Sequence, residues 1–479
     1  MALPPPWVRE IPYRTPVPLA AALAERPFTL LLDSAASGDA RARYSYLAFD
    51  PAATVRIPPG PRAAGQPGPF AALRAALRGW RQATHPDLPP FQGGAAGLFG
   101  YELGGDLETL PAPHPTGARP PDLAAGIYDV VAAFDHVAER AWLISTGFPE
   151  TAPAARARRA EARLAAGEAT LDRAAAAPVS APQAPPALSW DSDSAREAYL
   201  AKVRRAIEAI EAGEIFQVNL SRELVAPRPA LLRRFAFYQE MRARTQAPFS
   251  AYLGLPDGAA VCSFSPERFL QVTATGQVET RPIKGTRPRG ADPAEDDRLA
   301  AELAGSAKDR AENLMIVDLL RNDLARAGRI GTVRVPQLCG LERFGAVHHL
   351  VSVVTAELAP GYDALDLLAA AFPGGSITGA PKIRAMEIIH ALEQRRRGPY
   401  CGALAWLGFD GAMDSSILIR TMTLDRWTVR YGVGGGIVAD SDPEAEWRET
   451  EVKAAAFLSP PADSGAGNRA REDGRCGPA

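Results

Sequence analysis

The sequence predicts a protein that mixes strands and helices and is large enough for two or three domains. Residues 28–55 contain an apolar strand, a polar loop and a second strand of alternating polarity, which is typical of a hairpin-like opening to a sheet. Residues 194–224 contain a helix that ends at Gly213 and a strand that carries Gln217. The helix is indicated by apolar residues at helical spacing: Tyr199, Val203, Ile207 and Ile210. A chain of 479 residues can bury a large core.

The composition favours an enzyme that acts on a small molecule. The net charge of −2, from 53 basic and 55 acidic residues, gives no electrostatic reason to expect a nucleic-acid or anionic-membrane partner. Four widely spaced cysteines without a CxxC pair indicate neither a zinc site nor a disulfide framework, which suits a reducing cytoplasm. The N-terminus lacks the features of a signal peptide, and no run of 18 apolar residues occurs. We therefore expect a soluble cytoplasmic protein.

Shifts in composition suggest how the chain is divided. Between residues 150 and 190 a helix-prone stretch rich in Ala and Arg gives way to the helix-breaking PVSAPQAPPAL. We expect an N-terminal region at 1–175, a Pro/Ala-rich linker at 176–193 and a catalytic domain at 194–458. The tail 459–479 has almost no large apolar residue and is expected to be disordered.

A single lysine stands out in the stretch RPIKGTRPRG at residues 281–290. The preceding QVETRPI suggests a strand, and Pro288 and Gly290 end regular structure soon after Lys284. The end of a strand is a good place to hold a reactive group. The alternative is an ordinary solvated lysine, because lysine is seldom buried.

A carboxylate lies on the apolar face of the helix predicted for KDRAENLMIVDLLRND. Ile316, Leu319 and Leu320 follow Glu312 by four, seven and eight residues, so the carboxylate points the same way as the buried stripe. A lone carboxylate there would be costly. Glu312 therefore needs a cation or a proton, and a Lys or Arg partner is the alternative to a metal ion.

A second pair of carboxylates is predicted near the C-terminus. Ser441 and Glu444 have the spacing of a capping box and Pro443 favours a first turn, so a helix should start near residue 442. Glu446 and Glu449 then lie on one face and repel each other unless a cation or solvent separates them. Mg²⁺ binds through one or two carboxylates and completes its octahedron with water and substrate oxygens.

Two glycine-rich stretches are candidates for anion-binding loops. Gly434, Gly435 and Gly436 are predicted just after a strand, where their amides could turn towards a carboxylate, and a plain tight turn is the alternative. The stretch PGGSITGAPK is not a Walker motif, because Ala380 and Pro381 separate its glycine from its lysine. Nor is it a nucleophile elbow, because Thr378 takes the place of the second glycine.

Several of these stretches, in this order, resemble the chorismate-utilising enzymes. The resemblance is carried by SFSPERF, RPIKGT, AKDRAENLMIVDLLRND, AAFPGGSITGAPKIRAMEII and GGGIVADSDPEAEWRETEVKA, and runs from about residue 195 to 458. It implies an α+β fold, a four-layer sandwich of two face-packed β-sheets flanked by helices, as in anthranilate synthase component I. Region 1–175 resembles that protein's N-terminal domain more weakly. There, LLDSA and RYSYLAFDP resemble the segment that forms the tryptophan feedback pocket of anthranilate synthases.

Two positions indicate a branch of the family. Water-using members, the isochorismate and salicylate synthases, carry a lysine base where this chain has Gln217, and anthranilate synthases read PIAGT where it reads PIKGT. With Lys284 at this position, the chain resembles the branch of the family that converts chorismate and ammonia to 4-amino-4-deoxychorismate, on the way to p-aminobenzoate and folate. Anthranilate synthase and a catalytically silent binding subunit with the same fold are the alternatives.

The resemblance also implies roles for individual residues. Lys284 is expected to attack the chorismate ring, Glu267 to handle protons at the C4 hydroxyl, and His349 to lie near the departing oxygen. Glu312 and Glu449 are expected to hold Mg²⁺, with Glu446 beside them.

The resemblance assigns substrate binding to a larger group of residues. Trp406 belongs to this group and stands where tyrosine is common in the family, so a hydroxyl for the pyruvyl carboxylate would be lost. The expected substrate-binding residues are Gln217, Gly285, Thr286, Ser376, Thr378, Gly379, Trp406, Arg420, Gly434, Gly435, Gly436 and Lys453. Ammonia is expected from a separate glutamine amidotransferase subunit, because no amidotransferase motif is visible in the sequence.

Overall fold

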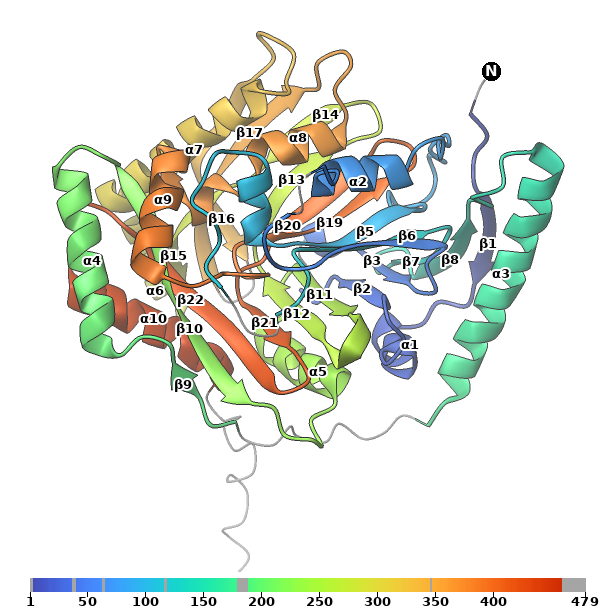
Figure 1. The fold of residues 1–479 in the computed structure, drawn as a ribbon, viewed down its shortest axis with the longest axis horizontal. Coiled ribbons are helices and arrows are strands. Elements are labelled where there is room, and N and C mark those ends of the chain that lie inside the picture. The colour runs from blue at the N-terminus through green and yellow to red at the C-terminus, as the bar shows by residue number, and fades with distance from the viewer. Residues whose placement is uncertain are drawn as a thin grey trace, which may run out of the picture.

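Two large antiparallel β-sheets form the centre of the protein, seen in a computed structural model (Figure 1). The structure describes residues 3–36, 40–62, 65–115, 119–178, 188–344 and 347–458. The predicted disordered tail at 459–479 and the middle of the predicted linker, residues 179–187, lie outside these ranges.

The first sheet has twelve strands in the described residues, and its order mixes early and late parts of the chain. Along the sheet the order is β1-β8-β7-β3-β2-β11-β12-β21-β22-β10-β18, and β9 also pairs with β10. The strands are β1 (Trp7–Ile11), β2 (Leu30–Asp33), β3 (Tyr44–Ala48), β7 (Val130–Asp135), β8 (Arg140–Ser145), β9 (Asp191–Ser192), β10 (Gln217–Pro227), β11 (Phe249–Gly254), β12 (Ala260–Ser265), β18 (Gly379–Ala380), β21 (Thr421–Leu424) and β22 (Thr428–Ile437).

The second sheet has ten strands in the described residues, in the order β15-β17-β14-β13-β20-β19-β5-β6-β4, with β16 also paired to β17. The strands are β4 (Ala53–Ile57), β5 (Gly94–Phe99), β6 (Leu123–Tyr128), β13 (Arg268–Val272), β14 (Gln277–Thr280), β15 (Ile283–Pro288), β16 (Arg334–Phe344), β17 (Val347–Glu357), β19 (Ala403–Gly408) and β20 (Met413–Ile417).

Helices cover the outer faces of the two sheets. Figure 1 shows α2, α7 and α8 along one side of the molecule and α1, α5 and α10 along the opposite side. The α-helices are α1 (Pro16–Leu23), α2 (Pro69–Ala76), α3 (Pro153–Ala176), α4 (Arg196–Glu211), α5 (Arg234–Thr245), α6 (Pro293–Gly305), α7 (Ala307–Ala325), α8 (Ala364–Ala371), α9 (Lys382–Glu393) and α10 (Pro443–Leu458). Short 3₁₀ turns are η1 (Ala40–Ala42), η2 (Tyr101–Asp106), η3 (Pro256–Gly258) and η4 (Gly375–Ile377).

Alternation along the strands builds the four layers. In β2, Leu30 joins the apolar cluster between the sheets, whereas Leu31 joins the outer cluster of the first sheet with side chains of α1, α3, α5 and α10. In β5, Leu98 points between the sheets and Phe99 packs outward with side chains of α2, α7 and α8. This is the period of two expected for strands buried on both faces. The predicted α+β four-layer sandwich is confirmed.

The two sequence regions on either side of residues 176–193 contribute strands to both sheets. Leu30–Leu32 of β2 pair with β3, as the predicted hairpin requires, and β2 also pairs with β11 from the C-terminal region. In the second sheet β5 pairs with β19. Helix α4 ends at Glu211, just before the predicted stop at Gly213, and β10 begins at Gln217.

None of the helices within the described ranges is long and apolar enough to cross a membrane.

Candidate active site

Lys284 lies in β15, at the border of the second sheet. A register shift between Ile283 and Thr286 interrupts the pairing of β15 with β17 at this position. Gly285 adopts a φ of +81°, and a β-carbon there would lie 2.8 Å from Leu303 and 2.9 Å from Asp309. The irregularity lets Lys284 leave the regular ladder of the sheet. Beside it, Thr286 Oγ1 lies 2.9 Å from Nδ1 of buried His349.

The amine of Lys284 lies close to Gln217 and to the end of β22. A β-carbon on Gly436 would lie 2.5 Å from Gln217 Nε2 and 3.7 Å from Lys284 Nζ. Gln217 is buried, and its Oε1 accepts no hydrogen bond within the described protein. A buried amide oxygen without a donor is unusual, which fits a side chain that faces a ligand.

Glu267 is the buried carboxyl of this site. It lies between β12 and β13, where its backbone nitrogen donates to Ser265 Oγ and its carbonyl accepts from the nitrogen of Ile417. Burial raises the pKa of Glu267 to about 7, although a hydrogen bond from Ser376 and the positive charges of Lys284 and Arg420 oppose the rise. A carboxyl with this pKa can carry a proton at neutral pH and donate it.

The segment that carries Ser376 runs directly beside Gln217. Thr378 O accepts a hydrogen bond from the backbone nitrogen of Asn219, and Thr378 Oγ1 donates to Gly374 O at 2.9 Å. Gly379 in β18 is indispensable there, because a β-carbon would lie 2.2 Å from Gln217 O and φ is +149°. The structure thus places Ser376 beside Glu267, and Thr378 and Gly379 beside β10.

Glu312 projects from α7 towards the same place. Burial raises the pKa of this half-buried carboxyl; the charges of Lys284 and Lys308 lower it, and those of Asp309 and Glu449 raise it. Glu312 is therefore within electrostatic range of Lys284 in β15 and of Glu449 in α10. Lys308, one turn before Glu312, was missed because the sequence marks it only as one more helical lysine.

Helix α10 carries three further charged residues of the predicted site. Glu449 forms an ion pair with Lys453 at 2.6 Å, and Lys453 Nζ also donates to Gly434 O at 2.8 Å. Glu446 is buried; Ser441 Oγ donates to its Oε1 at 2.7 Å, and its Oε2 has no hydrogen-bond partner in the described protein.

The predicted cap of α10 is corrected. Asp442, not Ser441, accepts from the backbone nitrogen of Ala445 at 2.8 Å, and the Ser441 hydroxyl instead orients Glu446.

The predicted metal ligands have a suitable chemistry, but only Glu446 and Glu449 are seen to lie close together. Among the described residues, no group of three or more His, Cys, Asp or Glu side chains is arranged to hold a metal ion. Burial chiefly, and then the negative charge of Glu449, raise the pKa of Glu446. A bound cation would reduce the repulsion between these two carboxylates. Carboxylate oxygens suit Mg²⁺. The carboxylates therefore suit Mg²⁺, provided that Glu449 gives up its ion pair with Lys453 to bind the ion.

The three glycines lie inside a strand and not after it. Gly434, Gly435 and Gly436 belong to β22 and pair with Ser221, Leu220 and Asn219 of β10. Their function is to leave room: a β-carbon on Gly435 would lie 3.1 Å from Glu446 Oε2 and 3.4 Å from Glu449 Oε1. This corrects the expected position just after a strand, because pairing with the distant strand β10 cannot be read from local sequence.

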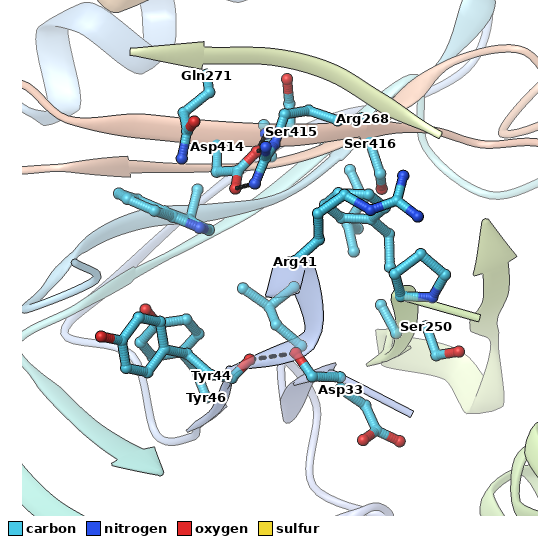
Figure 2. A pocket seen from close by; sticks show the side chains of 18 of the residues that line it. Asp33, Arg41, Tyr44, Tyr46, Ser250, Arg268, Gln271, Asp414, Ser415 and Ser416 are labelled. Carbon is cyan, nitrogen blue, oxygen red and sulfur yellow. Dashed lines mark hydrogen bonds and ion pairs between the residues drawn. The ribbon is translucent and has the colours of Figure 1, made fainter. Parts of the chain in front are cut away.

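Trp406 lies in a different cavity. Its indole stacks on Phe91, with ring centroids 5.1 Å apart, and lines a cavity of about 220 Å³ between the two sheets. Figure 2 shows this cavity, with Asp33 and Tyr44 on one side and Arg268 and Asp414 on the other.

The lining of this cavity includes none of the other predicted site residues, so Trp406 is not brought to Lys284. The segments LLDSA and RYSYLAFDP do meet here, through residues such as Ser34 and Tyr46.

Comparison with known proteins gives this geometry a context. The family model for chorismate binding enzymes matches residues 29–459. The chain belongs to this family of enzymes. It is 42% identical over 438 residues to aminodeoxychorismate synthase component 1 of Klebsiella aerogenes, covering 89% of this chain and 92% of that protein. It is 41% identical to anthranilate synthase component 1 of Thermus thermophilus, covering 93% and 94%.

A solved structure agrees with the family. Anthranilate synthase component I from Streptococcus pneumoniae superimposes with a TM-score of 0.75 at 30% identity, covering 87% of this chain and 92% of that chain. Because relatives from two branches of the chorismate-binding family are nearly equally similar, overall identity does not separate their activities. The residues of the Lys284 site have to do so.

Proposed function

We propose that this chain is the chorismate-aminating component of an aminodeoxychorismate synthase, producing 4-amino-4-deoxychorismate for p-aminobenzoate and folate synthesis. The observation that carries the proposal is the convergence of Lys284 with a buried carboxyl, Glu267, whose pKa of about 7 suits a general acid. Curated relatives named aminodeoxychorismate synthase component 1 support this choice. An anthranilate synthase would have no evident use for an amine at this position.

The proposed reaction proceeds in two displacements. Lys284 Nζ, in its neutral form, attacks C2 of chorismate; both conjugated ring double bonds shift by one position, and the C4–O bond breaks as Glu267 donates a proton, so that water leaves. Ammonia then adds at C4, both double bonds shift back, and the C2–N bond to Lys284 breaks. The product carries nitrogen at C4, and Lys284 is regenerated. His349, held by Thr286, is assigned to the side of the departing oxygen.

Mg²⁺ is proposed as the cofactor, held by Glu312 and Glu449 with Glu446 beside them. When bound, it would neutralise the ring carboxylate of chorismate. Lys453 and Arg420 are assigned to the anionic side chain of the substrate, and Gln217 to a polar group of the ring. The free Oε1 of Gln217 and the unpartnered Oε2 of Glu446 support these assignments.

Ammonia is proposed to come from a glutamine amidotransferase subunit. The relatives' designation as component 1 implies a second component. The expected location of both is the cytoplasm.

A product assay tests the proposed function. The purified chain is incubated with chorismate, ammonium and Mg²⁺, with and without an aminodeoxychorismate lyase. We expect p-aminobenzoate only when the lyase is present. Fluorescent anthranilate without lyase would establish the other branch of the family, and the absence of both products would identify a silent binding subunit.

A further inference from the structure

A fully buried arginine lies beneath the wall of the Lys284 site. The side chain of Arg397 is 1% exposed. Its Nη2 donates to Asn219 O at 2.6 Å, and its Nη1 donates to Ile377 O at 3.0 Å. These carbonyls belong to β10 and η4, which are joined at the same level by the hydrogen bond from Asn219 N to Thr378 O. One guanidinium therefore ties together two segments that are far apart in sequence.

The charge of this guanidinium is balanced locally. Arg397 Nε and Nη2 donate to the two carboxylate oxygens of Glu393 at 3.0 and 2.7 Å. Glu393 Oε1 also accepts from the backbone nitrogen and the hydroxyl of Ser221, both at 2.8 Å. Burial alone would raise the pKa of Glu393, but Arg397 and Arg395 hold it down at about 2. The pair stays ionised. Through Ser221, Glu393 also anchors it to β10, in addition to the bonds from Arg397 to Asn219 and Ile377.

The two segments tied by Arg397 carry side chains that the reaction uses. Ser376 immediately precedes Ile377 and donates its hydroxyl to Glu267. Gln217 lies two residues before Asn219, and its amide faces the amine of Lys284 across Gly436. We propose that Arg397 is a positioning residue, which holds η4 and β10 so that Ser376 and Gln217 meet Glu267 and Lys284 in register. Arg397 itself touches neither the substrate nor the reacting atoms.

The geometry of the donors explains why arginine is needed. The planar fork of a guanidinium supplies donors in fixed directions to several acceptors at once, whereas an ammonium on a flexible stem does not. Without the fork, the buried carbonyls of Ile377 and Asn219 lose donors, and buried acceptors without donors are costly. Segment η4 should then shift until solvent or another donor satisfies them.

Arg396 provides a matched control. It is adjacent in sequence and its side chain is 2% exposed, but it donates to Asp122 at 2.6 Å and, within the described residues, to neither Ile377 nor Asn219. Arg397→Lys and Arg396→Lys both replace a buried fork by an ammonium. Only the first removes donors from the wall of the site.

The first readout does not depend on the reaction. Amide hydrogen exchange by mass spectrometry should show faster exchange in the peptide covering residues 374–380 in Arg397→Lys than in Arg396→Lys. Equal exchange of this peptide in the two variants would overturn the proposal. This readout stands even if the proposed function fails, because no turnover is required.

The second readout rests on the proposed function. Turnover of chorismate by Arg397→Lys should fall about 10²-fold, as expected for a small misplacement of catalytic groups, and that of Arg396→Lys should stay near normal. In Arg397→Lys the alkaline limb of the pH–rate profile should also move to higher pH. Loss of the Ser376 hydrogen bond raises the pKa of Glu267, although the charges of Lys284 and Arg420 still oppose the rise. If both variants lost rate and both kept the wild-type pH–rate profile, Arg397 would have only a structural role and the proposal would be wrong.

A second variant keeps the proposal testable if Arg397→Lys fails to fold. Glu393→Gln retains an acceptor for Ser221 and Arg397 but removes the charge that fixes the guanidinium. It should show the same faster exchange at residues 374–380. Exchange at the wild-type rate in a folded Glu393→Gln protein would contradict the proposal.

Discussion

Replacing Glu267 with glutamine should stabilise the folded chain at alkaline pH and leave its stability unchanged at acidic pH. Glu267 is 7% exposed, and the pKa of its carboxyl in the folded protein is about 7 against an ordinary value of 4.5. Below pH 4.5 the group is protonated in both folded and unfolded chains and costs nothing. As the pH rises through about 7, ionisation favours the unfolded chain, and the difference in pKa corresponds to about 3 kcal/mol. A neutral amide avoids this cost.

Urea unfolding at about pH 4.5 and about pH 8.5 measures this effect. The free energy of unfolding of Glu267→Gln should exceed that of wild type by about 3 kcal/mol at the higher pH only. Glu451→Gln, a change at an exposed position of α10, is the control and should match wild type at both values. If Glu267→Gln and wild type were equally stable at about pH 8.5, Glu267 would be solvated there, and its role as a general acid would lose its physical basis.

The remaining predictions concern the metal, the ammonia source and the cavity between the sheets. Glu449→Gln should leave the fold intact but abolish Mg²⁺-dependent turnover and weaken Mg²⁺ binding in calorimetry, whereas unchanged affinity would remove Glu449 from the ligand set. The purified chain should use added ammonium but not glutamine alone, and glutamine-driven turnover would contradict the proposed division of labour. Trp406→Tyr should change KM for chorismate by less than about twofold, because Trp406 lines the cavity between the sheets; a tenfold change would place it at the substrate.

The sequence predicted those features that depend on local periodicity. The helix that carries Glu312 is α7, and Ile316 and Leu320 are buried as the apolar stripe required. The strand beginning at Gln217 and the helix carrying Glu446 and Glu449 are also found. These features arise from hydrophobic spacing and turn residues within about twenty positions, so that no knowledge of distant partners is needed.

Features that depend on distant partners could not be predicted from the residues. The glycines at 434–436 are predicted just after a strand and not within one, because only the structure shows their pairing with β10. Trp406 alternates correctly for a strand, but periodicity does not say which cavity a face of the sheet meets. Glu393 lies only four residues before Arg397, but the acceptors that tie the site together, Asn219 and Ile377, are 178 and 20 residues away, and no local pattern indicates them.

Lys284 as a covalent nucleophile is the central claim, and mass spectrometry of its peptide tests it most directly. The enzyme is mixed with chorismate and Mg²⁺ without ammonia, quenched and digested. We expect an adduct with the mass of chorismate less one water on the peptide that contains Lys284, absent from Lys284→Ala. Lys284→Arg should form no adduct and should not restore turnover, because a guanidinium stays protonated and cannot attack. A wild-type enzyme without adduct, together with an active Lys284→Ala or Lys284→Arg variant, would contradict the account and leave the lysine as an electrostatic support.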